Sequence, residues 1–114
     1  METQTLINLV TTTLDDHKAI DIKYIDVTDM TDIIDGMIIA SGTSTRHVKS
    51  LADKVIEAAK KAGERPLGTE GENTGEWVLI DLTDIVVHIM LPEQREFYNL
   101  EKLWMATETL RNAS

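Results

Sequence analysis

The sequence contains no cysteine, and its 114 residues include only two prolines and five aromatic side chains. The absence of cysteine excludes thiol catalysis, a disulfide framework and cysteine-ligated zinc. No apolar run approaches the roughly 20 residues of a membrane span, and the N-terminal METQTLINLV lacks the basic start and apolar stretch of a signal peptide. We therefore expect a cytoplasmic protein with no membrane partner.

Basic residues are also scarce. Eleven Lys and Arg face twenty Asp and Glu, which gives a formal net charge of -9. This charge repels phosphate backbones, so it argues against broad nucleic-acid binding and favours a basic protein partner, although negative charge also simply promotes solubility. A chain of this length forms one domain, residues 1–114, which can bury a core without disulfides or metal.

A predicted β-hairpin, Glu76 to Leu91, is the stretch around which the chain is organised. If Thr83-Asp84 is its two-residue loop, side-chain alternation places three wholly apolar pairs on one face, which should be core. The opposite face mixes apolar and polar groups and needs an explanation. Its pairs are Asp81 with Val86, Leu79 with His88, and Trp77 with Met90.

The first half of the chain predicts a helix followed by two strands. Apolar residues at helical spacing indicate an N-terminal helix within residues 1–18, and alternation indicates a strand from Ala19 to Val27. The turn-rich stretch Thr28 to Asp35 follows, in which Ile33 and Ile34 need cover. Gly36 to Gly42 is typical of a central strand that is buried on both faces.

The second half predicts two helices around the hairpin. Hydroxyl residues 43–45 offer N-caps for a helix that runs to Ala62, with Gly63 at its C-terminal end. The glycine-rich loop that follows contains a brief edge strand at Pro66 to Thr69. Pro92 opens the last helix, and residues 105–114 form a C-terminal tail. In that helix the residues that recur toward the sheet are Phe97, Leu100, Leu103 and Trp104.

This order of elements predicts an α/β fold, a small mixed β-sheet packed with helices. The strand, Gly-Thr-Ser and helix from Gly36 onward resemble the phosphate-holding unit of nucleotidyltransferases, and a nucleotide-binding enzyme of that type is the alternative function. Such enzymes need two carboxylates two residues apart on one strand, whereas a turn separates Asp81 from Asp84. We therefore predict no catalytic role for Asp81 and Asp84.

The histidines do not predict a metal site. His88 and Asp84 share a face of the hairpin but lie four residues apart, roughly 13 Å at ~3.3 Å per residue, which is too far for one ion. Arg46 and His47 in the first turn of the second helix could bind an anion, because helix N-termini favour negative charge. A capping or packing role is the simpler interpretation of His47.

Trp77 and Met90 are the pair on the mixed face that we single out for function. We expect them to be exposed, since Trp is enriched in binding hot spots and Met in adaptable interfaces. Burial under the last helix is the competing interpretation, and a simple dimer interface is a third. The residues alone do not decide between these three interpretations of Trp77 and Met90.

Four motifs in order resemble the ribosomal silencing factor family, also called Iojap-like: IIASGTSTRHVKSLAD, LGTEGENTGEWVLIDL, DIVVHIM and REFYNLEKLW. The resemblance spans about Ile20 to Trp104. It implies a nucleotidyltransferase-like fold without the active site, no cofactor and no enzymatic activity. It also implies a translational repressor that binds the large ribosomal subunit through its fourteenth protein and blocks joining of the small subunit when nutrients are short.

The family's partner-binding residues map onto Trp77, Leu82, Met90 and Tyr98 of this chain. The family also implies self-association of free copies as a homodimer. One departure concerns the hairpin turn, which is usually Gly-Asp in the family and is Thr83-Asp84 here. Because Thr tolerates positive φ poorly, the geometry of this turn is a point to test.

Overall fold

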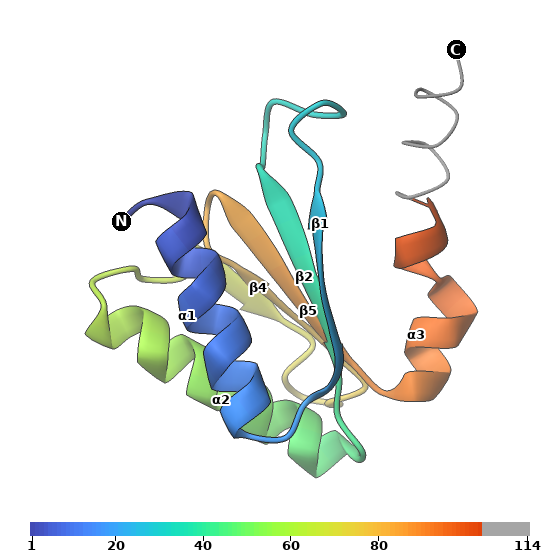
Figure 1. Cartoon of the computed structure of the whole chain (residues 1–114). Helices are drawn as coiled ribbons and strands as arrows, with labels where there is room; N and C mark the ends of the chain where they lie inside the picture. The colour runs from blue at the N-terminus through green and yellow to red at the C-terminus, as the bar shows by residue number, and fades with distance from the viewer. Residues whose placement is uncertain (104–114) are drawn as a thin grey trace.

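The computed structural model describes residues 1–103, which fold into a five-stranded mixed sheet with helices on both faces (Figure 1). The elements are α1 (Thr3–Asp16), β1 (Ile20–Asp26), β2 (Gly36–Ser41), α2 (Thr45–Lys61), β3 (Gly68–Glu70), β4 (Trp77–Asp81), β5 (Ile85–Met90) and α3 (Pro92–Tyr98). Within these residues, no helix is long and apolar enough to cross a membrane. The predicted α/β class and element order are therefore confirmed.

The strands lie in the order β1-β2-β5-β4-β3. Among the strands of residues 1–103, β2 and β5 are the single parallel pair, and the chain between them includes α2, β3 and β4. All six residues of β2 are buried, as its apolar run predicts, and it is an interior strand although β5 is the middle one. The β4–β5 ladder pairs Trp77 with Met90 and Leu79 with His88, which confirms the predicted register.

The two faces of the sheet are covered differently. Helices α1 and α2 lie side by side on one face, and α3 lies on the other (Figure 1). The main core forms under α1 and α2 and includes the apolar hairpin residues Val78, Ile80 and Leu82. A smaller cluster of Ile25, Val27, Met37, Ile39 and Met90 lies on the α3 face.

The sequence predicted the ends of α2 well. The Ser44 hydroxyl accepts a hydrogen bond from the His47 backbone N–H at 3.1 Å, so Ser44 is the N-cap. Gly63 follows the last turn with φ of 84°, the left-handed conformation that favours glycine at this position. Five buried side chains on one face of α2 then anchor it on the sheet.

Other details differ from expectation. Strand β1 contains a register shift between Ile20 and Lys23, so its side chains do not alternate strictly. Ile34 packs against the smaller cluster, but Ile33 is 86% exposed, and the prediction that both find cover is wrong for Ile33. The turn between β1 and β2 places only one of the two neighbouring side chains toward the sheet.

The last helix also departs from the predicted pattern. It ends at Tyr98 because Asn99 takes the left-handed conformation with φ of 46°, and a new helical turn starts at Leu100. Leu100 packs on the smaller cluster, but Phe97 is 79% and Leu103 62% exposed, so their predicted packing is wrong. The break at Asn99 interrupts the helical repeat on which that prediction relied. Trp104 and the predicted tail, residues 105–114, lie outside the described residues.

Candidate partner-binding surface

Trp77 is positioned by the loop that precedes β4. Gly71 and Gly75 both have positive φ, 85° and 72°, and a Cβ atom on Gly71 would collide with the carbonyl oxygen of Trp77. Glycine at position 71 therefore lets the loop pass close to the backbone at the start of the strand. Trp77 pairs directly with Met90 across the ladder, and its side chain is half-buried on the α3 face.

His88 fixes the orientation of the Trp77 ring. The indole N–H of Trp77 donates a hydrogen bond to Nδ1 of His88 at 3.0 Å, and the ring centroids are 5.8 Å apart. His88 is 7% exposed, and burial lowers the pKa of its imidazole to about 4. The imidazole is therefore neutral at neutral pH, which leaves the Nδ1 lone pair free to accept the hydrogen bond from the indole N–H.

Two aromatic side chains of α3 extend the surface from Trp77. The Tyr98 ring lies 4.9 Å from the Trp77 ring at an angle of 48°, and the Phe97 ring lies edge-on to Tyr98 at 5.0 Å. Tyr98 is 52% and Phe97 79% exposed, so both present apolar area to solvent. We call Trp77, Phe97 and Tyr98 together the aromatic surface. Contiguous aromatic groups of this kind are typical of protein–protein binding sites.

Exposed acidic residues lie on the same elements as the aromatic surface. Glu76 is exposed directly before Trp77, and Glu93 and Glu96 are exposed on α3. The Glu76 carboxylate accepts a hydrogen bond from the Gln94 side chain at 3.2 Å, which ties the start of β4 to α3. A partner that fits this surface would bring an apolar patch with basic residues at its edge.

Leu82 and Met90 lie beneath the surface of the protein. Leu82 is 3% exposed and belongs to the core under α1 and α2, while Met90 is fully buried in the smaller cluster. The expectation that Met90 is exposed beside Trp77 is therefore wrong. Met90 supports Trp77 from below, because the two are cross-strand partners in one cluster, whereas Leu82 lies at the opposite end of β4.

The two hairpin aspartates make different contacts. The Asp81 carboxylate accepts a hydrogen bond from the Thr83 backbone N–H at 2.9 Å, whereas Asp84 accepts one from the Asp35 N–H through its backbone carbonyl oxygen, at 2.7 Å. Within residues 1–103, no group of three or more His, Cys, Asp or Glu side chains is placed to hold a metal ion. The Asp81 side chain is thus explained by the local structure of the hairpin turn.

His47 joins two loops. Its Nδ1 accepts a hydrogen bond from the Thr43 backbone N–H at 2.9 Å, and its Nε2 donates one to the His17 carbonyl oxygen at 3.0 Å. The ring therefore connects the start of α2 to the end of α1. These contacts agree with the packing role that the sequence favoured over an anion site shared with Arg46.

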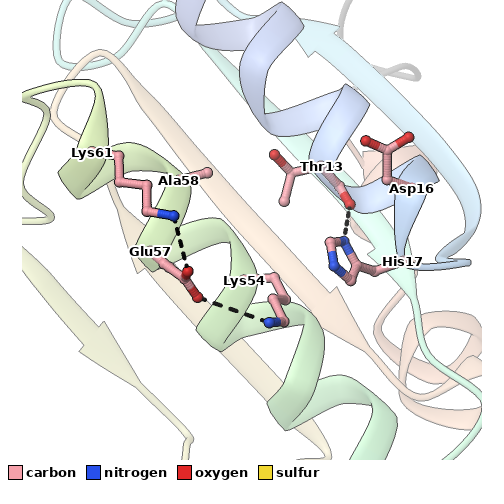
Figure 2. A pocket seen from close by; sticks show the side chains of 7 residues that line it. All are labelled: Thr13, Asp16, His17, Lys54, Glu57, Ala58 and Lys61. Carbon is pink, nitrogen blue, oxygen red and sulfur yellow. Dashed lines mark hydrogen bonds and ion pairs between the residues drawn. The ribbon is translucent and has the colours of Figure 1, made fainter.

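A cavity of about 240 Å³ lies between α1 and α2, on the face opposite the aromatic surface (Figure 2). The Glu57 carboxylate pairs with Lys61 at 3.3 Å and Lys54 at 3.9 Å, and His17 donates to the Thr13 carbonyl oxygen at 2.9 Å. These contacts pair Glu57, Lys54 and Lys61 with one another and His17 with the backbone of α1. Its lining consists of Thr13, Asp16, His17, Lys54, Glu57, Ala58 and Lys61.

Sequence reasoning missed two residues of this surface. Phe97 was assigned to the sheet because the helical repeat was extended past Asn99, and an Asn at that position is the signal that the helix ends there. His88 was considered as part of the mixed face and as a metal ligand, but not as a partner of Trp77. His88 is paired directly with Leu79 in the ladder. Its contact with Trp77 is therefore one between diagonal neighbours on adjacent strands. Diagonal neighbours on the same face of a hairpin are the signal that could have found this contact.

The chain is similar to several known proteins. The family model described as "Ribosomal silencing factor during starvation" matches residues 1–114. A ribosomal silencing factor of Haemophilus influenzae is 46% identical over 99 residues, which cover 87% of this chain and 97% of the relative. The mouse protein named "Mitochondrial assembly of ribosomal large subunit protein 1" is 37% identical over 101 residues, 86% of this chain and 44% of the relative.

Solved structures agree with these matches. A crystal structure of a Chromobacterium violaceum protein superposes with a TM-score of 0.89 at 44% identity, covering 91% of this chain and 87% of that one. A second, from Bacillus halodurans, gives a TM-score of 0.82 at 34% identity, with coverages of 90% and 95%. The family resemblance in the four motifs is thereby confirmed: this chain belongs to the ribosomal silencing factor family.

Proposed function

We propose that this protein binds the large ribosomal subunit through the aromatic surface and prevents the small subunit from joining, which lowers translation when nutrients are short. Membership of the ribosomal silencing factor family supports a ribosome-associated, regulatory role. The name of the mouse relative refers to the large subunit, which supports that subunit as the partner. The fourteenth large-subunit protein is the contact that the family resemblance implies.

The contact between Trp77 and Tyr98 is the observation that carries this proposal. The two rings come from different elements, meet at 4.9 Å, and leave Tyr98 and Phe97 exposed around a half-buried indole. Large aromatic groups that are already ordered lose little side-chain entropy on binding, so they serve well as anchors. The buried residues Leu82 and Met90 contribute to this site by supporting the hairpin.

Charge supports a protein contact over an RNA contact. The chain carries a net charge of -9, and Glu76, Glu93 and Glu96 are exposed on the segments that carry the aromatic surface. Such a surface attracts a basic ribosomal protein and is repelled by neighbouring RNA phosphates, which favours one docking position over many. Charge would set the approach, and the aromatic contacts would set the lifetime of the complex.

Binding of Trp77→Ala to purified large subunits tests this proposal. Loss of a central aromatic anchor should weaken binding by about 2 kcal/mol or more, roughly 30-fold, while circular dichroism confirms that the variant is folded. Leu67→Ala is the matched control, since Leu67 is 72% exposed but lies near Asp81 at the other end of β4. Unchanged affinity of Trp77→Ala contradicts this surface, and failure of the unmodified protein to bind contradicts the function.

Self-association through the same aromatic surface is the competing role, because exposed aromatic rings also form dimers. Light scattering on the unmodified protein and on Trp77→Ala measures it on the samples used for binding. If the variant is monomeric and still binds large subunits with full affinity, the aromatic surface is a dimer contact. A sucrose-gradient assay of subunit joining then tests whether bound protein keeps the subunits apart.

A further inference from the structure

Helix α3 carries two of the three aromatic residues but has little apolar attachment of its own. None of its residues, Pro92 to Tyr98, is buried. Leu100, beyond the break at Asn99, is the residue that packs on the smaller cluster. Apolar burial within α3 therefore does not explain why this helix holds Tyr98 at a defined position against Trp77.

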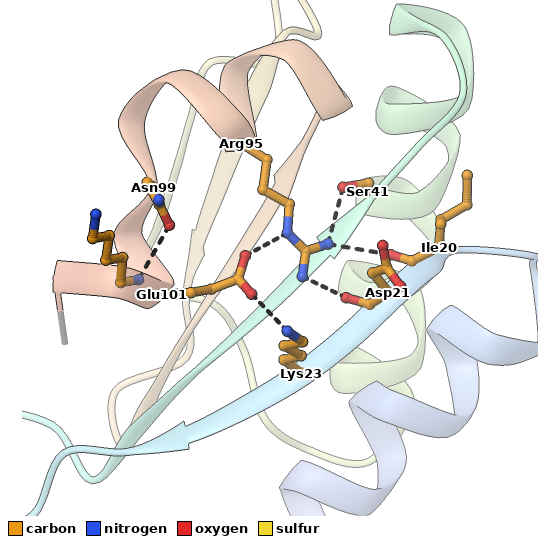
Figure 3. Close-up of polar contacts among 8 residues, drawn as sticks. Ile20, Asp21, Lys23, Ser41, Arg95, Asn99 and Glu101 are labelled. Carbon is orange, nitrogen blue, oxygen red and sulfur yellow. Dashed lines mark hydrogen bonds and ion pairs between the residues drawn. The ribbon is translucent and has the colours of Figure 1, made fainter. Parts of the chain in front are cut away.

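Arg95 provides a polar attachment in its place. Its side chain is 11% exposed and points from α3 toward the ends of β1 and β2 (Figure 3). The guanidinium donates hydrogen bonds to four oxygens on three parts of the chain. They are Oε1 of Glu101 at 2.6 Å, Oγ of Ser41 at 3.0 Å, and the carbonyl oxygens of Asp21 at 2.6 Å and Ile20 at 3.4 Å.

The irregular start of β1 presents two of these acceptors. Ile20 pairs with Ser41 and Lys23 pairs with Ile39, so β1 has one more residue than β2 in this interval. Within the irregularity Asp21 has φ of 50°, an uncommon conformation for a residue other than glycine. The resulting backbone directs the Ile20 and Asp21 carbonyl oxygens toward the Arg95 guanidinium.

Glu101 completes the attachment on the far side of Asn99. Its carboxylate accepts from Nε of Arg95 and also pairs with Nζ of Lys23 at 3.2 Å. The hydrogen bond from Arg95, with a second from Lys23, lowers the pKa of the Glu101 carboxyl, so the group is ionised at neutral pH. Because Tyr98 lies between Arg95 and Glu101 in the chain, this pair holds both ends of the segment that carries it.

We propose that Arg95 is the positioning residue of the aromatic surface: its contacts to Glu101, Ser41 and the irregular start of β1 hold α3 so that Tyr98 packs against Trp77. The consequence for ribosome binding rests on the proposed function, whereas the Tyr98–Trp77 contact can be measured in the free protein. Arginine is required because its planar group donates in several fixed directions at once. The point charge of lysine cannot reproduce these directions.

The test uses Arg95→Lys, which keeps the positive charge and removes the planar guanidinium with its several N–H donors. A Trp104→Phe background leaves Trp77 as the single tryptophan, so its fluorescence reports the aromatic surface directly. We expect Arg95→Lys to shift Trp77 emission to the red and to lose the nuclear Overhauser contacts between Tyr98 and Trp77. Large-subunit binding should weaken roughly tenfold, as expected when a hydrogen-bonded charge loses its partners. Arg46→Lys, on an exposed arginine of α2, is the matched control.

A second pair of variants separates positioning from general stability. Glu101→Gln keeps an oxygen that can accept from Arg95, whereas Glu101→Ala removes it. We expect Glu101→Ala to lose the Tyr98–Trp77 contact and Glu101→Gln to retain most of it. If Arg95→Lys fails to fold, the Glu101 pair decides: loss of the contact in Glu101→Ala but not in Glu101→Gln supports the proposal, and any other pattern overturns it.

The outcomes distinguish this proposal from the proposed function. A folded Arg95→Lys variant that keeps both Trp77 emission and the Tyr98–Trp77 contact overturns the positioning role, whatever its affinity for ribosomes. If the contact is lost while large-subunit binding is unchanged, and Trp77→Ala also binds normally, Arg95 positions the aromatic surface but this surface does not bind the ribosome.

Discussion

The two faces of the sheet are built on different principles. Among the described residues, seventeen buried apolar side chains form the core under α1 and α2, against five in the cluster on the α3 face. The first face is held by apolar packing. The second depends on the polar contacts of Arg95 and leaves Phe97 and Tyr98 exposed. Apolar packing is thus concentrated on one face, and the proposed function assigns recognition to the other. We therefore expect mutations on the first face to act mainly on stability and mutations of the aromatic surface to act mainly on binding.

The largest effect on stability should come from Leu51→Ala. Leu51 is 1% exposed in the core under α1 and α2, so truncation leaves a cavity and should lower the free energy of unfolding by about 3 kcal/mol. Urea denaturation measures this loss. Leu100→Ala, on the half-buried leucine of the α3 face, should cost about 1 kcal/mol. An equal loss at both positions would contradict the difference between the two faces.

Acid should act on the α3 face through His88. The pKa of His88 is about 4 in the folded protein because of burial, against 6.5 in the unfolded chain. Below pH 6.5 the unfolded state therefore binds a proton that the folded state does not, and the stability falls as the pH drops from 6.5 toward 4, by roughly 3 kcal/mol at most. Below the folded pKa this contribution stops changing.

His88→Asn isolates the contribution of His88. The Asn side-chain oxygen can occupy the place of Nδ1 and accept the Trp77 N–H, but it does not titrate. Urea denaturation at a series of pH values should show a smaller loss of stability in the variant than in the unmodified protein between pH 6.5 and pH 4. Identical pH profiles for the two proteins would show that His88 titrates alike in the folded and unfolded states.

A smaller effect is expected at the start of α2, on the other face. Ser44→Ala removes the hydroxyl that accepts from the His47 N–H, which should cost about 1 kcal/mol in urea denaturation. Ser50→Ala is the control, because Ser50 is exposed in the interior of the same helix and alanine is the better helix former there. Large-subunit affinity should be unchanged in both variants, since α2 and α3 lie on opposite faces of the sheet (Figure 1).

The parts of the fold that follow from periodicity could be predicted from the sequence. The register of the hairpin and the ends of α2 are set by alternating apolar residues, hydroxyl caps and Gly63, all of which act locally. The irregular start of β1 could not be predicted, because Asp21, with its positive φ, contacts Arg95, which lies 74 positions away in the sequence. Backbone strain of this kind depends on tertiary contacts.

The aromatic surface was predicted in part, for a related reason. Alternation correctly places Trp77 and Met90 on one face of the hairpin, but it cannot say which of them the last helix covers. That outcome depends on the break at Asn99, which turns Leu100 toward the sheet and leaves Phe97 in solvent. Tyr98 was predicted as a binding residue from the family motif, whereas its contact with Trp77 could be found only in the structure.

The smallest predicted effect is a gain in stability at the hairpin turn that joins β4 and β5. Thr83 has φ of 76°, and the Asp84 N–H donates to the Leu82 carbonyl oxygen at 3.0 Å, which is a tight γ-turn around a β-branched residue. Thr83→Gly removes this strain but adds freedom to the unfolded chain, so the net gain should be roughly 0.5 kcal/mol. Asp84→Gly is the control, because Asp84 has no positive φ and should only lose stability. Urea midpoints measure both variants, and a loss in Thr83→Gly would mean that its side chain stabilises the turn by more than its backbone strains it.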